Sequence, residues 1–353
     1  VGTVIQKLEH MHPGTYVGTG KLEEIRDMIW EKEATGIICD DELSPIQMRN
    51  MEQVLDSKVM DRTLLILDIF AARARTSEGK IQVELAQLKY RASRLAGFGR
   101  SMSRLGGGIG TRGPGEKKLE IDRRLIGHRT AQLNRELKEV VRHRELTRTQ
   151  RMKSHTKVAA IVGYTNAGKS TLLNTLTNAG VLEEDQLFAT LDPTTRMLEL
   201  SNHQNLMLTD TVGFIRKLPH HLIEAFKSTL EEAKYADYII HVVDASNPQA
   251  DKQMHIVYET LRSLGVEDKK ILTLFNKQDA RTDDEPLHDF LADKTINISA
   301  KYGIGLDAVK EALADFLRAD KILVERVIPY QDAGILQAVR KMGELLEEEY
   351  QPE

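Results

Sequence analysis

Gly163-Tyr-Thr-Asn-Ala-Gly-Lys-Ser170 is the stretch that decides the fold of this chain of 353 residues. The apolar segment Lys157–Val162 precedes it, and Thr171–Thr177, which follows, has the pattern of a helix. A strand, a tight glycine loop and a helix in this order form an anion site, because backbone N–H groups converge on phosphate oxygens and the helix N-terminus adds partial positive charge. These neighbours argue against a glycine turn without function, so we expect a phosphate-binding loop.

Two side chains at the end of this loop have the chemistry that a nucleoside triphosphate requires. The amine of Lys169 would reach the β- and γ-phosphates, and the hydroxyl of Ser170 would hold Mg2+, a hard cation that prefers oxygen ligands. The candidate nucleotide-binding residues of the loop are Gly163, Tyr164, Thr165, Asn166, Ala167, Gly168, Lys169, Ser170 and Thr171.

Three later segments, each directly after an apolar strand pattern, indicate which nucleotide binds. Asp210 would orient Mg2+, directly or through water, and the N–H group of Gly213 would donate to the γ-phosphate. Asp279 would accept two hydrogen bonds from the N1–H and the exocyclic amine of guanine, a pair of donors that adenine lacks. The segments are Asp210, Thr211, Val212 and Gly213 after Asn205–Thr209, Asn276, Lys277, Gln278 and Asp279 after Ile271–Phe275, and Ser299, Ala300 and Lys301 after Thr295–Ile298. Their order predicts a GTP-specific P-loop domain with a mostly parallel sheet.

Several stretches of the sequence resemble a known family. Phe188-Ala-Thr-Leu-Asp-Pro-Thr-Thr-Arg196, together with Asp210-Thr-Val-Gly-Phe214, is similar to the HflX family of translation-factor-related GTPases. Upstream, Gln82–Leu88 and Ser103–Glu116, followed by Lys118–Arg124, resemble that family's helical domain and its glycine-rich loop.

The resemblance covers nearly the whole chain, with one modest departure: Lys117 stands where the family often has Thr. The chain also opens inside what resembles the family's N-terminal domain, so we expect it to be trimmed or partial.

The resemblance implies a switch segment that binds nucleotide. Thr190 would be its Mg2+ ligand, although Thr194 and Thr195 are nearby alternatives. Residues 183–196 would be ordered only with GTP bound, since contacts to the γ-phosphate and Mg2+ hold such switches. The candidate nucleotide-binding residues here are Phe188, Ala189, Thr190, Leu191 and Asp192.

Composition bounds the class of protein. Hydrophobic residues make up 41% of the chain, which is enough for buried cores, and the single cysteine, Cys39, argues against a disulfide framework. We expect Cys39 to be a small buried residue. The sequence has neither an opening signal peptide nor an apolar run near the roughly 18 residues of a membrane span, which favours a cytoplasmic protein.

Charge is unevenly distributed along the chain. The net charge is −4, yet residues 86–155 hold 18 Lys and Arg against 6 Asp and Glu, so this segment carries +12 and the remainder −16. Such a basic segment in an acidic protein favours a nucleic-acid partner over a merely solvated helix face, which would mix both signs.

The basic segment has the pattern of two packed helices. Its apolar residues recur at helical spacing and predict an antiparallel hairpin over residues 79–154, with a glycine-rich tip at 97–115 that would approach RNA. Phe98 would either stack on a base or anchor a helix end. The apolar residues are Ile81, Leu85, Leu88, Ala92 and Leu95, and then Leu119, Ile126, Leu133 and Val140. The candidate RNA-binding residues are Arg100, Arg104, Arg112, Lys117, Lys118, Arg123 and Arg124.

Three further segments flank or follow the hairpin. Residues 1–78 predict a small α/β subdomain with a strand at Gly36–Asp40 and a helix that begins after Ser44, an N-cap followed by Pro45. Residues 155–320 would form the P-loop domain. Residues 321–353 would form a short α/β segment, with a strand at Val324–Ile328 and a helix over 334–349.

The catalytic step is the least determined by sequence. Many GTPases place a glutamine after the DxxG element to orient the attacking water, but Phe214 stands there and can neither orient water nor donate a hydrogen bond. We therefore expect a low intrinsic rate and a partner that completes the site. Asn166 matches an asparagine with which some related GTPases hold K+ near the β–γ bridge, or it is simply a tolerated loop residue.

Together these features predict a GTPase, monomeric when free, that binds GTP, GDP and Mg2+ and docks its hairpin on ribosomal RNA of the large subunit. The resemblance to HflX implies that docking dissociates stalled or idle ribosomes into subunits and that the ribosome stimulates hydrolysis. Two alternatives stay open: an RNA-remodelling NTPase that uses ATP as well as GTP, and an RNA-binding scaffold that nucleotide merely stabilises.

Overall fold

The chain forms two compact units, Val1–Ala314 and Asp315–Glu353. In this computed structural model the side chains of 96–102, 114–118, 145 and 147–153 are not described. The structure describes residues 1–102, 114–153, 156–177, 194–200, 204–216, 232–266, 268–282 and 286–320, and near the end 324–329, 334–335, 337 and 347–349.

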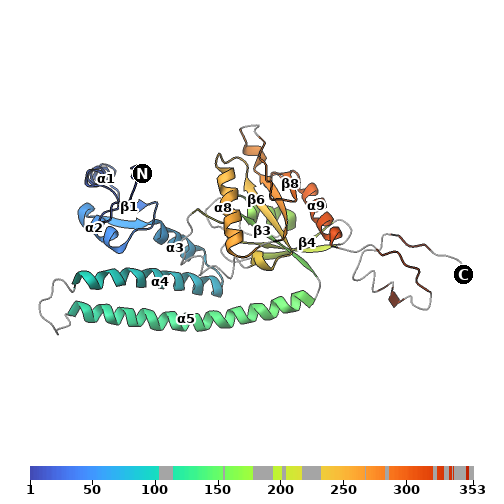
Figure 1. Cartoon of the computed structure of the whole chain (residues 1–353), viewed down its shortest axis with the longest axis horizontal. Helices are drawn as coiled ribbons and strands as arrows, with labels where there is room; N and C mark the ends of the chain where they lie inside the picture. Colours follow the sequence, from blue (N-terminus) through green and yellow to red (C-terminus); the bar gives the residue numbers. More distant parts are fainter. Residues whose placement is uncertain are drawn as a thin grey trace. The chain divides into compact units, whose positions relative to one another are not determined.

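The N-terminal residues form an α/β subdomain around a small core, as the sequence predicts (Figure 1). The Ser44 hydroxyl accepts from the N–H group of Gln47, and the Gln47 side chain accepts from the Ser44 N–H group, so a capping box begins the second helix. Cys39 is buried in the core, where burial raises the pKa of its thiol to about 11. The elements are α1 (Thr19–Glu31), β1 (Gly36–Cys39), α2 (Pro45–Leu55), β2 (Lys58–Asp61), which pairs parallel with β1, and α3 (Arg62–Arg73).

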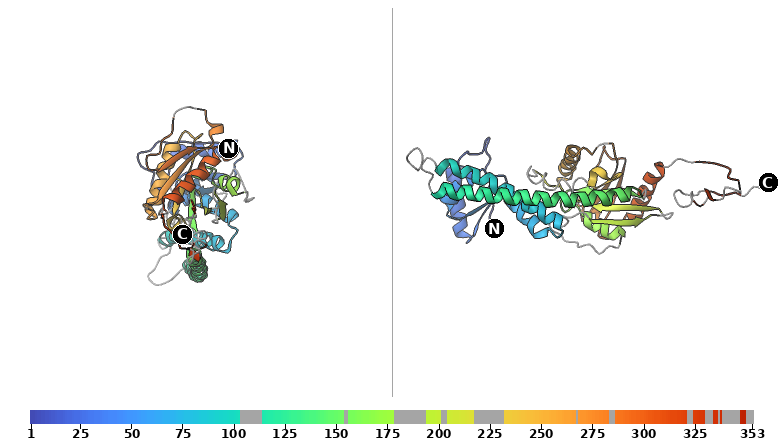
Figure 2. Two further views of the ribbon diagram at one scale, coloured as in Figure 1. Left: turned by 90° about the vertical axis from the view of Figure 1, so that its right-hand side faces the viewer. Right: turned by 90° about the horizontal axis from the view of Figure 1, so that it is seen from below.

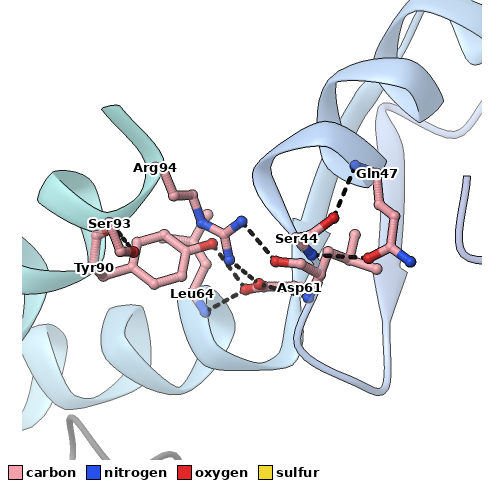
Figure 3. A network of polar contacts seen from close by, with 8 residues as sticks. Ser44, Gln47, Asp61, Leu64, Tyr90, Ser93 and Arg94 are labelled. Atoms are coloured by element: carbon pink, nitrogen blue, oxygen red, sulfur yellow. Dashed lines mark hydrogen bonds and ion pairs between the residues drawn. The ribbon is translucent and has the colours of Figure 1, made fainter. Parts of the chain in front are cut away.

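A buried carboxylate ties this subdomain to the helix that follows it (Figure 3). Asp61 is fully buried and accepts hydrogen bonds from the N–H groups of Leu43 (3.2 Å) and Leu64 (2.8 Å) and from the hydroxyl of Tyr90 (2.9 Å). Arg94 lies 2.5 Å from the same carboxylate and also donates to the Leu43 carbonyl at 2.7 Å. These donors come from the loop before α2, from α3 and from the following helix, so one carboxylate joins the subdomain to this helix.

The predicted hairpin is present as two long helices, α4 (Ser77–Met102) and α5 (Pro114–Lys153). Figures 1 and 2 both show them side by side. Glu84 pairs with Arg129 at 2.6 Å and Glu78 with Arg144 at 3.2 Å, so residue numbers rise along one helix as they fall along the other. The helices are therefore antiparallel. Their apolar seam buries Ile81, Leu85 and Leu133, flanked by the partly buried Leu88, Leu137 and Val140.

The remaining elements confirm a P-loop α/β domain with a mostly parallel sheet. Among the described residues, six strands lie in the order β4-β5-β3-β6-β7-β8, and β4, at one edge, is the antiparallel strand. The strands are β3 (Lys157–Gly163), β4 (Thr194–Glu199), β5 (Asn205–Asp210), β6 (Tyr238–Asp244), β7 (Lys270–Asn276) and β8 (Lys294–Asn297). The helices are α6 (Lys169–Thr177), α8 (Ala250–Ser263) and α9 (Leu306–Ala319), with a short 3-10 helix at Gln278–Ala280.

Both faces of the central strand β3 are covered. Ala160 and Val162 share a core cluster with Val257 and Leu261 of α8, and α3 and α4 contribute Phe70 and other residues to the same cluster. Ala159 and Ile161 point to the opposite face, because side chains alternate along a strand, and both are fully buried. The order of strands reverses between β3 and β6, which is where such sheets bind ligands, beyond the carboxyl ends of the strands.

The C-terminal segment differs from the prediction. Residues 324–329 have neither strand nor helix, so the strand expected at Val324–Ile328 is wrong. An apolar run becomes a strand only when another strand pairs with it, and no strand of the described ranges does so here. Residues 334, 335 and 337 are helical, as expected, whereas 347–349 are not. Within the described ranges, no helix is long and apolar enough to cross a membrane.

The Asp61 network predicts a large loss of stability on truncation. Asp61→Ala should lower the free energy of unfolding by about 3–5 kcal/mol, because it leaves the Arg94 guanidinium, whose side chain is 12% exposed, without its carboxylate. Asp68→Ala, at an exposed position of α3, should change it by less than about 0.5 kcal/mol. Urea unfolding followed by circular dichroism measures both, and equal values for the two variants would contradict the role of the network.

Candidate nucleotide-binding site

The phosphate loop runs from β3 to α6 and has two positions, 163 and 168, at which only glycine fits. A Cβ atom on Gly163 would lie 2.3 Å from the Val242 carbonyl oxygen, and one on Gly168, which has a φ of 97°, would lie 2.2 Å from the Asn276 amide nitrogen. Asn166 is exposed and has a φ of 62°, the left-handed region that asparagine tolerates better than most residues. This backbone requirement is by itself sufficient to explain an asparagine at position 166.

Lys169 is the buried charge of the loop. Its side chain is 6% exposed, and its amine donates to the Tyr164 carbonyl at 2.8 Å. Burial lowers the pKa of this amine to about 8, against the opposing effect of the Asp210 carboxylate. The lysine is thus held against its own loop, where phosphate oxygens would restore its full charge.

Ser170 and Asp210 offer oxygen ligands at the ends of two neighbouring elements. The Ser170 hydroxyl donates to the Asp210 carboxylate at 2.8 Å, and Asp210 is fully buried at the end of β5. A hydroxyl and a carboxylate at this distance, beside a phosphate loop, fit the donor set that Mg2+ shares with phosphates. Thr190 and the rest of Phe188–Asp192 lie outside the described residues. The hydroxyl of Thr195, an alternative to Thr190, lies 3.0 Å from that of Thr209 within the sheet.

The segment after Asp210 closes on the phosphate loop. A Cβ atom on Gly213 would lie 2.9 Å from the Lys169 amine and 2.9 Å from the Thr165 Cα atom, so only glycine fits. Thr165 N–H donates to the Phe214 carbonyl at 2.8 Å, and Phe214 N–H donates to the Gly163 carbonyl at 3.0 Å. The Phe214 side chain is 2% exposed within the core, so it faces away from any attacking water.

The side-chain amide of Asn276 connects the phosphate loop with the Ser299–Lys301 segment, which is expected near the base. The Asn276 side chain donates to the Ala167 carbonyl at 2.9 Å and accepts from the Ala300 N–H group at 2.9 Å. Asp279 is exposed and accepts from the Ser299 hydroxyl at 2.5 Å, which directs its carboxylate. Gln278 instead turns its amide toward the Phe275 carbonyl, away from the site.

Asp244, which sequence reasoning missed, forms an ion pair with Lys277 of the Asn276–Asp279 segment. Lys277 has a φ of 64°, and its amine lies 2.7 Å from the Asp244 carboxylate at the end of β6. A carboxylate directly after the buried run Tyr238–Val243 was the available signal, since neighbouring parallel strands end at the same edge.

Behind the phosphate loop lies a buried polar group, also missed. His241 of β6 lies beside Val162 of β3, is 1% exposed, and has its Nδ1 atom 3.7 Å from the Asp289 carboxylate. Burial lowers the pKa of His241 despite this carboxylate. Burial alone would raise the pKa of Asp289. His241 and two hydroxyls that donate to the carboxylate, those of Tyr258 at 2.7 Å and Thr273 at 2.7 Å, hold this pKa below its usual range.

Of the residues expected to contact RNA, Arg123 and Arg124 are exposed on α5, and Arg123 donates to the Leu95 carbonyl at 3.2 Å. Arg104 and Arg112 lie outside the described residues, and so do the side chains of Arg100, Lys117 and Lys118.

Comparison with protein families gives matches along most of the chain. Residues 1–71 match the model of the GTP-binding GTPase N-terminal region, and residues 73–151 match the GTP-binding GTPase middle region. Residues 158–277 match the family described as 50S ribosome-binding GTPase.

Curated relatives agree with these matches. GTPase HflX of Lacrimispora saccharolytica is 65% identical over 351 residues, covering 99% of this chain and 83% of the relative. GTPase HflX of Escherichia coli is 42% identical over 339 residues, covering 94% of this chain and 80% of the relative. Among solved structures, a GTP-binding protein from Sulfolobus solfataricus in complex with GDP is 26% identical, covers 89% of both chains and has a TM-score of 0.48.

The position of Asp279 predicts how the site selects its base. Asp279→Asn should weaken GTP binding by about 10- to 100-fold, because it removes a charged acceptor from guanine, and should leave ATP binding unchanged. Asp251→Asn, in the first turn of α8, is the control. Competition of GTP and ATP against a fluorescent GDP measures the difference, and equal losses for both nucleotides would contradict the assignment.

His241 predicts a loss of stability in mild acid. Its pKa is lowered in the folded protein, so the unfolded chain binds a proton below pH ~6.5 that the folded protein refuses. The free energy of unfolding should therefore fall between pH 6.5 and 5.5, by at most about 1.4 kcal/mol per pH unit for this group. Asp289, whose pKa is lowered, loses its contribution only in stronger acid.

His241→Asn should remove this part of the pH dependence. Urea unfolding of both proteins at pH 7.5 and 5.5 provides the test. An unchanged difference between the two pH values in the variant would show that His241 does not titrate on unfolding.

Proposed function

The chain belongs to the HflX family of GTPases, and from this premise we propose that it binds the large ribosomal subunit and dissociates stalled or idle ribosomes into subunits. It hydrolyses GTP, as the GTPase domain and the relatives establish. The observation that carries the ribosomal part of the proposal is the match of residues 158–277 to the 50S ribosome-binding GTPase family.

The geometry of the described residues supports a separate role for each residue of the nucleotide site. Lys169 holds the β- and γ-phosphates from inside the loop, and the Gly213 N–H group faces the γ-phosphate, where lack of a side chain lets it approach. Asn276 keeps the phosphate and base loops together while Asp279 accepts from guanine. GTPase domains generally require Mg2+, which neutralises phosphate charge when bound, and Ser170, Asp210 and Thr190 would hold it.

A partner would complete the catalytic site. Phe214 is buried and apolar, so the position that carries a water-orienting glutamine in many GTPases has no polar group here. We infer that contact with the ribosome orients the water. We also infer that K+ beside the exposed Asn166 neutralises charge at the β–γ bridge.

The hairpin would dock on ribosomal RNA. Exposed cations follow one another along α5 at Arg123, Arg124, Arg135, Lys138 and Arg142, and such charges bind phosphate backbones without regard to sequence. The proposal assigns RNA contact to Arg123 and Arg124 and, nearer the tip, to Arg100, Arg104, Arg112, Lys117 and Lys118. The domain division 1–78, 79–154, 155–320 and 321–353 remains part of the proposal, as does a cytoplasmic monomer.

GTP would control docking through the switch segment. Residues 194–196 of the predicted switch already belong to β4, so contacts of Thr190 to Mg2+ and to the γ-phosphate would order the part of the switch before β4, residues 183–193, and hydrolysis would remove those contacts. In this scheme GTP binding separates the subunits and hydrolysis releases the protein.

Ribosome-stimulated hydrolysis tests the proposal. In K+ buffer, purified large subunits should raise the GTPase rate by about tenfold or more, and subunit separation in sedimentation should persist with a non-hydrolysable GTP analogue. Lys169→Ala should abolish both. Failure to sediment with the large subunit would remove the ribosome from the proposal, and separation by Lys169→Ala would favour a nucleotide-stabilised scaffold.

Arg123→Glu with Arg124→Glu should abolish ribosome binding without changing GTP hydrolysis in its absence. Arg26→Glu, at an exposed position of α1, is the charge-matched control for one of these reversals.

A further inference from the structure

The backbone of residue 216, just beyond the Asp210–Gly213 segment expected to face the γ-phosphate, is held at both of its polar groups. Its N–H group donates to the Tyr164 hydroxyl at 3.0 Å, and its carbonyl accepts from Nη2 of Arg62 at 3.0 Å. The two partners come from different parts of the chain. Tyr164 belongs to the phosphate loop, whereas Arg62 is the first residue of α3, more than 90 residues before β3.

The Arg62 guanidinium is oriented before it reaches this carbonyl. Its side chain is 18% exposed, and its Nη1 atom lies 2.5 Å from the Asp40 carboxylate. The other oxygen of Asp40 lies 3.5 Å from the Arg216 guanidinium. Asp40 is 70% exposed, so its ion pairs add little stability, but they direct both arginines toward the same place.

The backbone of Arg216 directly follows the segment that contains Gly213 and Phe214. Gly213 lies three residues before Arg216, and Phe214 between them is buried with Ile66, Leu67 and Phe70 of α3. Because buried side chains are close-packed, Phe214 cannot move independently of α3.

Tyr164 also contacts the lysine of the phosphate loop through its backbone. Its carbonyl accepts from the Lys169 amine at 2.8 Å, while its hydroxyl holds residue 216. One residue of the phosphate loop therefore contacts both the lysine and the segment that follows Gly213.

We propose that Arg62 and Tyr164 are positioning residues for GTP hydrolysis, which together hold Gly213–Arg216 in the orientation that presents the Gly213 N–H group to the γ-phosphate. Neither the guanidinium nor the phenol touches the nucleotide in this role. Arg62 makes the N-terminal subdomain a contributor to chemistry carried out in the P-loop domain. The inference concerns hydrolysis by the protein alone and does not depend on the proposed ribosomal function.

Single-turnover GTP hydrolysis by the full chain, measured without ribosomes, tests the role of Arg62. Arg62→Gln should slow hydrolysis about tenfold, the effect of losing one hydrogen bond from a charged donor, while GTP affinity stays within about twofold. Arg62→Lys should recover part of the rate, because an amine can still donate to the Arg216 carbonyl. Arg26→Gln in α1 is the control and should hydrolyse GTP at the normal rate.

A second variant keeps the test decisive if Arg62→Gln fails to fold. Tyr164→Phe deletes one hydroxyl at an exposed hydrogen bond and should slow hydrolysis without a change in melting temperature. In the double variant the loss should be smaller than the product of the single losses, since both side chains hold the same segment.

Three results would overturn the proposal: normal hydrolysis by Tyr164→Phe and a folded Arg62→Gln, losses that multiply in the double variant, or a loss of GTP affinity equal to the loss of rate.

Discussion

A buried positive charge organises the nucleotide site. The amine of Lys169 is withdrawn from water, and its burial is costly enough to lower its pKa to about 8, so the surrounding chain must supply compensating groups. The Tyr164 carbonyl and the nearby Asp210 carboxylate do so. The same amine leaves no room for a side chain at position 213, which brings bare backbone to the place where phosphate would lie. The buried ammonium group therefore accounts for the nearby carboxylate at the end of β5 and contributes to the need for glycine at position 213.

Sequence alone predicted the parts of the fold that local pattern encodes. The phosphate loop, the strand before each nucleotide segment, the N-cap at Ser44 and the apolar seam of the hairpin each lie within a short run of residues. Asp244, His241 and Asp61 were missed because their roles depend on partners distant in the chain: Asp61 lies 33 positions before Arg94, and His241 lies 48 before Asp289. A strand at Val324–Ile328 was predicted wrongly, because an apolar run carries no information about whether another strand will pair with it.

The P-loop domain and the residues that precede it form one hydrophobic core. One core cluster joins Ala160 and Val162 of β3 to Phe70 of α3 and to Val83 and Tyr90 of α4. The face of the sheet that contains Val162 is therefore covered partly by residues that lie before the phosphate loop. Tyr90 also donates to Asp61, so the apolar cluster and the buried polar network meet at one side chain. An independent P-loop domain cut at residue 155 would expose this face to water.

The length of α5 has a mechanical consequence. Its 40 residues correspond to about 60 Å of helix, and Arg144, near its C-terminal end, lies 3.2 Å from Glu78 and 3.9 Å from Glu232, a residue of the P-loop domain. Because α4 packs along α5, the two helices would turn together about this anchor as one lever. A rotation of roughly 5° at that anchor would carry the opposite end through about 5 Å, comparable to one helical turn. A small rotation at this anchor is thus geometrically sufficient to produce a displacement of molecular size at the far end of α5.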